Sequence, residues 1–350
     1  VYTDEISNLF FRLEGSDPSA EPVVTGSHID TQPTGGKFDG AFGVVAGFEA
    51  VQAIVESGLT PTRPIEIVAW LNEEGSRFSP GMMGSEAFAG RRPLEQILAV
   101  TDADGVRTAD ALERTLAAFP DLPRRDLGFP VAAFIEAHIE QGPVLEQKGV
   151  PVGVVTGIQG SRRFRVEVKG EDGHAGTQPM PERKDALFAA LDMIGSMRSA
   201  FEPDEAKFTV GLFELSPNAP SVVPSRVFFS IDIRHPDWPT LSRLGDEVSM
   251  ICEANSGACS VTVTEIATSE SLEFPTEIRN CIADSAQGVG VPTVEILSLA
   301  GHDARQLHYH CLTGMIFTPC KDGISHNEAE SCDPAELAAG TRVLAATLVG

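Results

Sequence analysis

The sequence has no apolar run that approaches the roughly 18 residues needed to cross a membrane as a helix. Basic residues are also scarce: 26 Lys and Arg stand against 50 Asp and Glu, which gives a formal net charge of −24. A surface with this excess of negative charge repels phosphate backbones and anionic lipid headgroups. We therefore expect neither nucleic acid nor membrane partners.

Cysteine is sparse and unpatterned. The six cysteines form no C-x-x-C pair and no zinc-finger spacing, so free, buried thiols are expected instead of disulfides.

The first residues, VYTDEISNLFFRLEG, contain no basic stretch followed by an apolar one, and we expect a cytoplasmic protein. Because this start lacks Met and opens directly into a strand-like run, we also expect that an N-terminal segment is missing.

Several catalytic signatures are absent as well. The chain has no H-E-x-x-H, no G-x-S-x-G, no G-x-x-x-x-G-K-[ST], and no G-x-G-x-x-G after a strand. The absence of these motifs argues against four classes of enzyme: zincins, serine hydrolases, P-loop enzymes and Rossmann enzymes.

Strand-like and helix-like segments alternate at both ends of the chain, a pattern typical of an α/β sheet. The apolar runs lie at 22–30, 64–70, 131–140, 293–297 and 313–319, and the helical stretches at 40–58, 278–290 and 333–350. We predict one discontinuous α/β domain from residues 1–157 and 268–350.

The rhythm differs between residues 158 and 267. Alternating strand patterns and helical spacing follow one another as 163–170, 182–200, 207–215, 227–235, 240–255 and 259–267. This β-α-β-β-α-β order is that of a ferredoxin-like unit, which predicts an inserted second domain.

Carboxylates and histidines gather where the apolar strands of the first domain end. They are His28, Asp30, Asp39, the pair Glu73 and Glu74, His138, and His326. Imidazole and carboxylate are the ligands of hydrolytic zinc sites. Each position alone has a plainer explanation, since a single strand-end His is usually structural and an EE pair is usually solvated. Together they make a metal site as well supported as a set of structural roles, and the pattern alone leaves both open.

Position within each segment suggests a role. Asp30 follows His28 closely enough to orient its imidazole. Asp39, in a Gly-flanked loop, presents one carboxylate that could bridge two metals. If the chain is extended at Glu73 and Glu74, these side chains point to opposite sides, so that one binds metal while the other handles protons.

Seven motifs occur in order along the chain: GSHIDTQPTGGKFDG, NEEGSRFSPGMMGSEAFAG, EAHIEQGPVLE, GHAGTQPM, DIRHPD, AGHDA and DGISHNEAE. Together they resemble the N-carbamoyl-L-amino-acid hydrolase and allantoate amidohydrolase group of the aminoacylase-like dinuclear metallopeptidases. The resemblance implies a metallopeptidase-like α/β catalytic domain and a lid and dimerisation domain at 158–267. It also implies a homodimer and two divalent ions, Zn²⁺ first, with Mn²⁺, Co²⁺ or Ni²⁺ as alternatives.

The resemblance also assigns roles at the metal site. It implies that His28 and His326 bind one metal, that Glu74 and His138 bind the other, and that Asp39 bridges them. Glu73 matches the general base, which would deprotonate a metal-activated water and pass the proton to the leaving nitrogen.

Further matches concern the substrate. His174 corresponds to a histidine that stabilises the oxyanion from the partner subunit, and Gln141 and Arg234 correspond to substrate contacts, with Arg234 suited to a carboxylate. A turn histidine and a solvated Arg are the plain alternatives. One departure stands out: Ser221 occupies a position where the family has Asn, and the nearest Asn is Asn218. Ser cannot donate and accept as an amide does, which leaves the substrate open.

The expected reaction is hydrolysis of an N-carbamoyl-L-amino acid to ammonia, carbon dioxide and the amino acid. Carbamoylases are favoured over allantoate enzymes by one cue, because the motif NEEGSRF followed by MMGSEAFAG looks more like the carbamoylase subgroup. The alternatives are an allantoate amidohydrolase, a beta-ureidopropionase, a dipeptidase or aminoacylase, and a binding protein without activity.

Two further pairs of residues have other expected roles. His302 and Asp303 could either support the metal ligands or form a buried hydrogen-bonded pair. His308 and His310 are expected to be structural.

Overall fold

The computed structural model describes all 350 residues, which form two compact units. Unit 1 comprises residues 1–157 and 273–350, and unit 2 comprises residues 158–272. The second boundary falls at 273, not at 268 as predicted from sequence, because β13 (Ser260–Ser269) extends beyond residue 267 and β14 (Leu272–Glu273) already pairs in the sheet of unit 1. None of the helices combines the length and apolar character that a membrane crossing demands.

A nine-stranded sheet forms the centre of unit 1, in the order β1-β2-β4-β3-β5-β16-β6-β14, with β15 also paired to β6. Its strands are β1 (Tyr2–Thr3), β2 (Leu9–Leu13), β3 (Val23–His28), β4 (Ile65–Trp70), β5 (Ala133–Ile139), β6 (Val152–Ile158), β14, β15 (Thr293–Ser298) and β16 (Leu312–Thr318). The four central strands β4, β3, β5 and β16 are parallel. Their carboxyl ends therefore meet at one edge.

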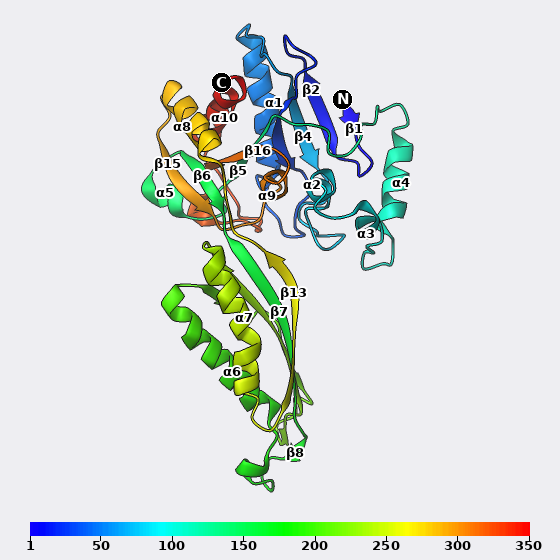
Figure 1. Cartoon of the computed structure of the whole chain (residues 1–350), viewed down its shortest axis with the longest axis vertical. Coiled ribbons are helices and arrows are strands. Elements are labelled where there is room, and N and C mark those ends of the chain that lie inside the picture. The colour runs from blue at the N-terminus through cyan, green and yellow to red at the C-terminus, as the bar shows by residue number, and fades with distance from the viewer. The chain divides into compact units, whose positions relative to one another are not determined.

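Helices cover both faces of this sheet. Since consecutive strand residues point to opposite faces, β4 shows the two layers: Ile67 packs with Val44 of α1, whereas Trp70 contacts Phe88 of α2 at a ring distance of 5.2 Å. One layer contains α1 (Ala41–Glu56), α8 (Thr276–Gly288) and α10 (Pro334–Val349), and α2 (Met83–Phe88) packs with α9 (Ala304–Leu307) (Figure 1). The remaining helices are α3 (Leu94–Leu98), α4 (Thr108–Ala118) and α5 (Val144–Lys148).

Unit 2 has two helices on one face of a five-stranded antiparallel sheet (Figure 1). Its elements are β7 (Gly160–Lys169), α6 (Ala186–Phe201), β9 (Lys207–Thr209), β10 (Phe213–Ser216), β12 (Arg226–His235), α7 (Trp238–Ala254) and β13 (Ser260–Ser269), in the sheet order β10-β12-β7-β13 with β9 also on β12. A small ribbon pairs β8 (Gly173–His174) with β11 (Val222–Val223). Alternate residues of β7 are buried against α6 and α7, as expected for a sheet covered on one face.

The predicted single strand at 207–215 is wrong, because it is broken into β9 and β10. Thr209 faces Asp232 and Phe213 faces Phe229, so four steps along one strand oppose three along β12. One residue is therefore extra, as in a β-bulge. The hydroxyl of Ser230 accepts a hydrogen bond from the Leu212 amide in this segment.

Glu66 is a fully buried carboxylate in β4 that is paired with two arginines. Its Oε1 lies 2.8 Å from Arg12 Nη1 and its Oε2 lies 2.7 Å from Arg125 Nη1. We expect Glu66→Ala to lower the free energy of unfolding by about 3–5 kcal/mol, because it leaves two guanidinium groups without their anion. Glu167→Ala, which removes a partly exposed partner of Lys169, should cost about 1 kcal/mol or less. Equal losses in denaturant titrations would contradict this account.

Candidate metal centre

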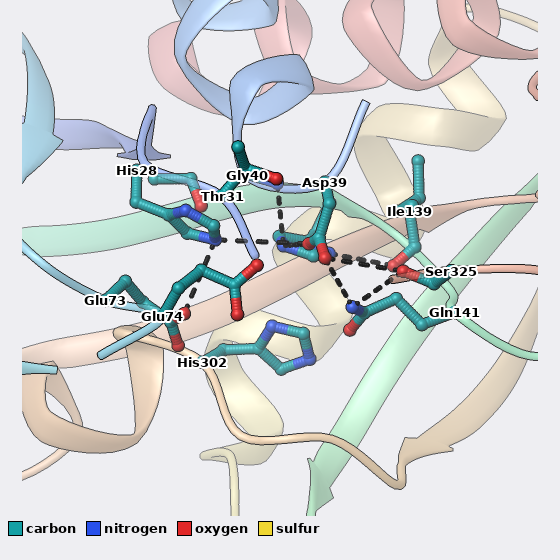
Figure 2. Close-up of polar contacts among 12 residues, drawn as sticks. His28, Thr31, Asp39, Gly40, Glu73, Glu74, Ile139, Gln141, His302 and Ser325 are labelled. Atoms are coloured by element: carbon teal, nitrogen blue, oxygen red, sulfur yellow. Dashed lines mark hydrogen bonds and ion pairs between the residues drawn. The ribbon is translucent and has the colours of Figure 1, made fainter. Parts of the chain in front are cut away.

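The sequence-predicted residues of unit 1 lie together at the carboxyl edge of the parallel strands. β3 ends at His28, β5 carries His138 at its penultimate position, and the loops after β4 and β16 carry the Glu73–Glu74 pair and His326. Crevices at this edge are where open α/β sheets bind ligands. In Figure 2 the side chains of His28, Glu73 and Glu74 converge on the region of Asp39.

Asp39 is the centre of this arrangement and is 4% exposed. Its Oδ1 lies 3.3 Å from His138 Nε2 and 4.0 Å from His28 Nε2, whereas its Oδ2 lies 3.1 Å from His326 Nε2. Glu74 Oε2 lies 3.4 Å from His326 Nε2. Two groups of potential ligands therefore share Asp39, one with His28 and His138, the other with Glu74 and His326.

This grouping corrects the pairing implied by the resemblance, which joined His28 to His326 and Glu74 to His138. The reason lies in strand order. β3 and β5 are neighbours in the sheet, so the histidines at their ends lie next to each other. His326 arrives from the loop after β16 and meets Glu74 instead.

Double variants test the grouping. If two metal ions bind as the geometry implies, His28→Ala with His138→Ala should retain about one ion per chain, because Asp39, Glu74 and His326 remain. His28→Ala with His326→Ala damages both groups and should retain almost none. Metal content after equilibrium dialysis distinguishes these results, and the reverse pattern would restore the pairing inferred from the resemblance.

The electrostatics of the centre favour a bound cation. Burial raises the pKa of Asp39, but hydrogen bonds with His138 and His326 outweigh it and hold the pKa well below the usual range. Burial lowers the pKa of His138, yet Asp39 and Glu136 together raise it to about 9. One oxygen of Glu74, Oε1, is buried without a hydrogen-bond partner. An anion among imidazoles and a buried carboxylate oxygen without a donor fit a divalent cation that takes nitrogen and oxygen ligands.

Glu73 lies beside the two groups of ligands. Its Oε2 is 3.6 Å from His28 Nε2. Burial, followed by the nearby carboxylates of Asp303 and Glu74, raises its pKa well above the usual range. A carboxyl group with a raised pKa next to a potential cation site is suited to accept and return a proton.

The prediction that the chain is extended at Glu73 and Glu74 is wrong. The chain turns sharply after β4, and Asn72 has a φ of 53°. The Asp30 carboxylate holds this turn: Oδ1 accepts the Glu73 N–H at 3.1 Å and Oδ2 accepts the Glu74 N–H at 3.0 Å. Asp30 also contacts His28, mainly through its backbone oxygen, which lies 2.9 Å from Nδ1. Asp30 therefore positions three site residues, His28, Glu73 and Glu74.

Several residues that support the ligands were not singled out from sequence. Gln32 donates to Glu74 Oε2 at 2.9 Å, and Glu136 accepts from the hydroxyl of Ser27 at 2.7 Å. Ser325 and Glu330 contact the Asp39 loop. All of them lie inside motifs that the sequence already marked, GSHIDTQPTGGKFDG, EAHIEQGPVLE and DGISHNEAE. Motif membership is thus the signal that could have found them.

Gln141, expected to contact substrate, lies at the centre itself. Its Nε2 donates to Asp39 Oδ2 at 3.0 Å and to Ser325 Oγ at 3.0 Å. His302 packs on His138 at a ring distance of 4.5 Å, and its Nε2 lies 2.9 Å from Ser298 Oγ. Burial lowers the pKa of His302 well below its usual range, which favours the neutral ring.

The outer histidines and Asp303 have structural contacts. Asp303 is fully buried and accepts a hydrogen bond from Ser85. His310 Nε2 lies 3.0 Å from the backbone oxygen of Phe129. His308 stacks edge-on against Phe274.

The other predicted site residues belong to unit 2. His174 is exposed in β8, opposite Val222, and its Nδ1 accepts N–H groups from Gly176 and Thr177 at 3.0 and 3.2 Å. This leaves Nε2 as the protonated nitrogen, free to donate. The neighbouring backbone oxygen of Ser221 accepts the Ala175 N–H, and Asn218 has a φ of 55° in the preceding turn.

Arg234 lies at the other end of unit 2. It occupies β12 opposite Ser161, and its Nε and Nη2 contact the Asp232 carboxylate at 3.0 and 3.1 Å. The β8–β11 ribbon adjoins the Arg226 end of the same strand. Eight residues of strand separate the two ends by about 27 Å. Within one chain the structure therefore does not bring Arg234 together with His174, Asn218 or Ser221.

Comparison with known proteins identifies the class. The N-carbamoyl-L-amino-acid amidohydrolase of Rhizobium meliloti is 37% identical over 349 residues, covering 97% of this chain and 82% of that protein. The allantoate amidohydrolase of Bacillus subtilis (strain 168) is 36% identical over 352 residues, covering 97% and 84%. The crystal structure of an amidase of the hydantoinase/carbamoylase family from Burkholderia multivorans is 39% identical, with a TM-score of 0.88 and coverage of 99% and 85%.

Fold, site and relatives together define a hydrolase that acts on carbon–nitrogen bonds. Residues 24–349 match peptidase family M20/M25/M40, and the chain belongs to this family. The predicted α/β fold class, the family resemblance and the hydrolase class are confirmed. The six cysteines are free in the structure; the thiols were expected to be buried, and three of them are (Cys252, Cys320 and Cys332), whereas Cys259, Cys281 and Cys311 are partly exposed.

Proposed function

We propose that this chain hydrolyses N-carbamoyl-L-amino acids to the amino acid, ammonia and carbon dioxide, with two divalent ions bound around Asp39. The observation that supports this most is the grouping of four further ligands around the two oxygens of Asp39, with Glu73 beside them. The carbamoylase relative of Rhizobium meliloti supports the substrate class.

His28 and His138 would hold one ion, and Glu74 and His326 the other. When bound, such ions lower the pKa of water and polarise a carbonyl oxygen. Zn²⁺ is proposed first, because imidazole nitrogen and carboxylate oxygen are its usual ligands, although Mn²⁺, Co²⁺ and Ni²⁺ accept the same donors.

The residues of the chain would divide the remaining tasks. Glu73 takes a proton from the attacking water and returns it to the leaving nitrogen. Asp30 keeps Glu73 and Glu74 in their turn through the two N–H groups that it accepts. The Nε2–H of His174 is suited to stabilise an oxyanion, and the guanidinium of Arg234 is suited to bind the substrate carboxylate.

The separation of Arg234 from His174 supports a homodimer. Because about 27 Å of strand lies between them, one small substrate cannot contact both residues of the same chain, and a partner subunit would supply His174. On α6, Phe188 and Leu191 are 53% and 47% exposed, which suits an apolar contact between copies. Sedimentation should show a dimer, and a fully active monomer would contradict this proposal. We also propose a cytoplasmic location, which suits the free thiols.

A substrate panel tests the proposed function. The panel contains N-carbamoyl-L- and D-amino acids, allantoate, N-carbamoyl-β-alanine and a dipeptide, with ammonia or free amine as the product measured. We expect the highest kcat/KM with an N-carbamoyl-L-amino acid. Higher kcat/KM with allantoate would redirect the assignment to the activity of the Bacillus subtilis relative, and no turnover of any member would contradict it.

Metal binding should depend on pH. A histidine binds metal through its neutral form, and the raised pKa of His138, about 9, keeps it protonated near pH 7 in the metal-free protein. Binding must therefore release this proton, and affinity should rise by roughly tenfold per pH unit between about pH 7 and pH 9. Titration calorimetry in two buffers with different ionisation enthalpies measures the proton release. An affinity that is flat over this range would contradict the assignment of His138.

A further inference from the structure

Glu330 lies 4% exposed in the loop after β16, four residues beyond His326. Its Oε1 accepts the N–H groups of Phe38 and Asp39 at 2.8 and 3.1 Å. Its Oε2 accepts the hydroxyl of Ser325 at 3.0 Å. The carboxylate therefore joins the backbone of the Asp39 loop to the loop that carries His326.

The contacts continue to the Asp39 side chain. Ser325 Oγ lies 3.3 Å from Asp39 Oδ2, the oxygen that faces His326. Gln141 donates to both Ser325 Oγ and Asp39 Oδ2. Figure 2 shows Gln141 and Ser325 approaching Asp39 together. Asp39 is thus held at two points: Glu330 accepts its backbone N–H, and Ser325 and Gln141 contact its carboxylate.

Backbone hydrogen bonds hold the loop that carries Glu330. The Glu330 N–H donates to the backbone oxygen of Asn327, the residue after His326, and the loop is closed by the Lys321 N–H donating to Ser331. The Asp39 loop packs tightly on the carboxylate, since a Cβ at Gly36 would lie 2.0 Å from Glu330 Oε1. A shift of Glu330 would therefore move both Asp39 and His326.

We propose that Glu330 is a positioning residue that sets the distance between Asp39 and His326, so that both metal ions depend on it. This rests on the proposed function, because it takes Asp39 as the ligand that the two ions share. Residues that orient metal ligands usually contribute about 10–100-fold to metal affinity. Glu330 acts through hydrogen bonds to the ligand loops and not as a ligand, since neither of the groups around Asp39 includes it.

Metal titration of three variants tests the proposal, with Zn²⁺ as the probe. Glu330→Ala should weaken the binding of both ions by about 10–100-fold. Glu330→Gln keeps an oxygen for the two N–H groups and an amide for Ser325, and it should stay within about threefold of the unmodified protein.

Asp102→Ala is the matched control. Asp102 accepts N–H groups from Asp104 and Val106 at 3.0 and 2.8 Å, and from Arg77 Nε at 3.0 Å, away from the metal ligands. We expect it to lower thermal stability without changing metal affinity.

Two results would overturn the inference alone: Glu330→Ala with unchanged metal affinity, or Glu330→Gln as weak as Glu330→Ala. In either case two ions would still bind the unmodified protein, and the proposed function would stand. If the unmodified protein bound no metal after reconstitution, the inference and the proposed function would both fail.

Discussion

Glu73→Gln should lower kcat by about 10²–10⁴-fold while metal content stays unchanged. The amide has nearly the shape of the carboxylate but cannot accept the proton of the attacking water. Glu73 is buried, and its pKa is raised by burial and by the charges of Asp303 and Glu74. Neither group of potential metal ligands includes it. Steady-state kinetics together with elemental analysis measure both quantities.

Glu86→Gln is the control for this variant. Glu86 is another carboxyl group whose pKa burial raises, but its partner is Arg92. It should retain activity close to that of the unmodified protein. Full activity of Glu73→Gln would show that another group takes the proton, and a loss of metal would show that Glu73 is a ligand.

Asp39→Ala should abolish the binding of both ions, with a loss in affinity beyond the roughly 100-fold upper range for residues that only orient ligands. Each group of potential ligands uses one oxygen of this carboxylate. Removal of its charge should also lower the pKa of His138 from about 9, because Asp39 contributes most to raising it. Elemental analysis and NMR titration of the imidazole resonances measure the two effects.

Asp102→Ala again serves as the control, with both ions retained. An Asp39→Ala protein that still bound two ions tightly would mean that the ions do not share this carboxylate, and the account of the centre would be wrong.

Much of unit 1 follows from sequence because parallel strands bring their carboxyl ends to one edge. Residues at the ends of separate apolar runs, such as His28, His138 and the Glu73–Glu74 pair, must then lie close together. The order of the strands in the sheet, by contrast, could not be predicted, because the sequence contains no sign that β3 and β5 are neighbours. That order decides which histidines face the same oxygen of Asp39, so the pairing could not be predicted correctly.

Contacts between distant segments explain the other errors. The turn at Glu73 and Glu74 depends on two N–H groups reaching Asp30, more than forty residues earlier in the chain. Glu330 likewise contacts Asp39 from 291 residues away. The break between β9 and β10 depends on registration against β12. None of these is visible in the local pattern of apolar residues, which determines only where the elements form.

The most direct test of the central claim is ammonia release from an N-carbamoyl-L-amino acid by chelated protein as Zn²⁺ is added back stepwise. We predict no release from metal-free protein and full release at about two ions per chain, the number that the two groups around Asp39 can hold. Undiminished release from fully chelated protein would contradict a metal-dependent reaction at this centre.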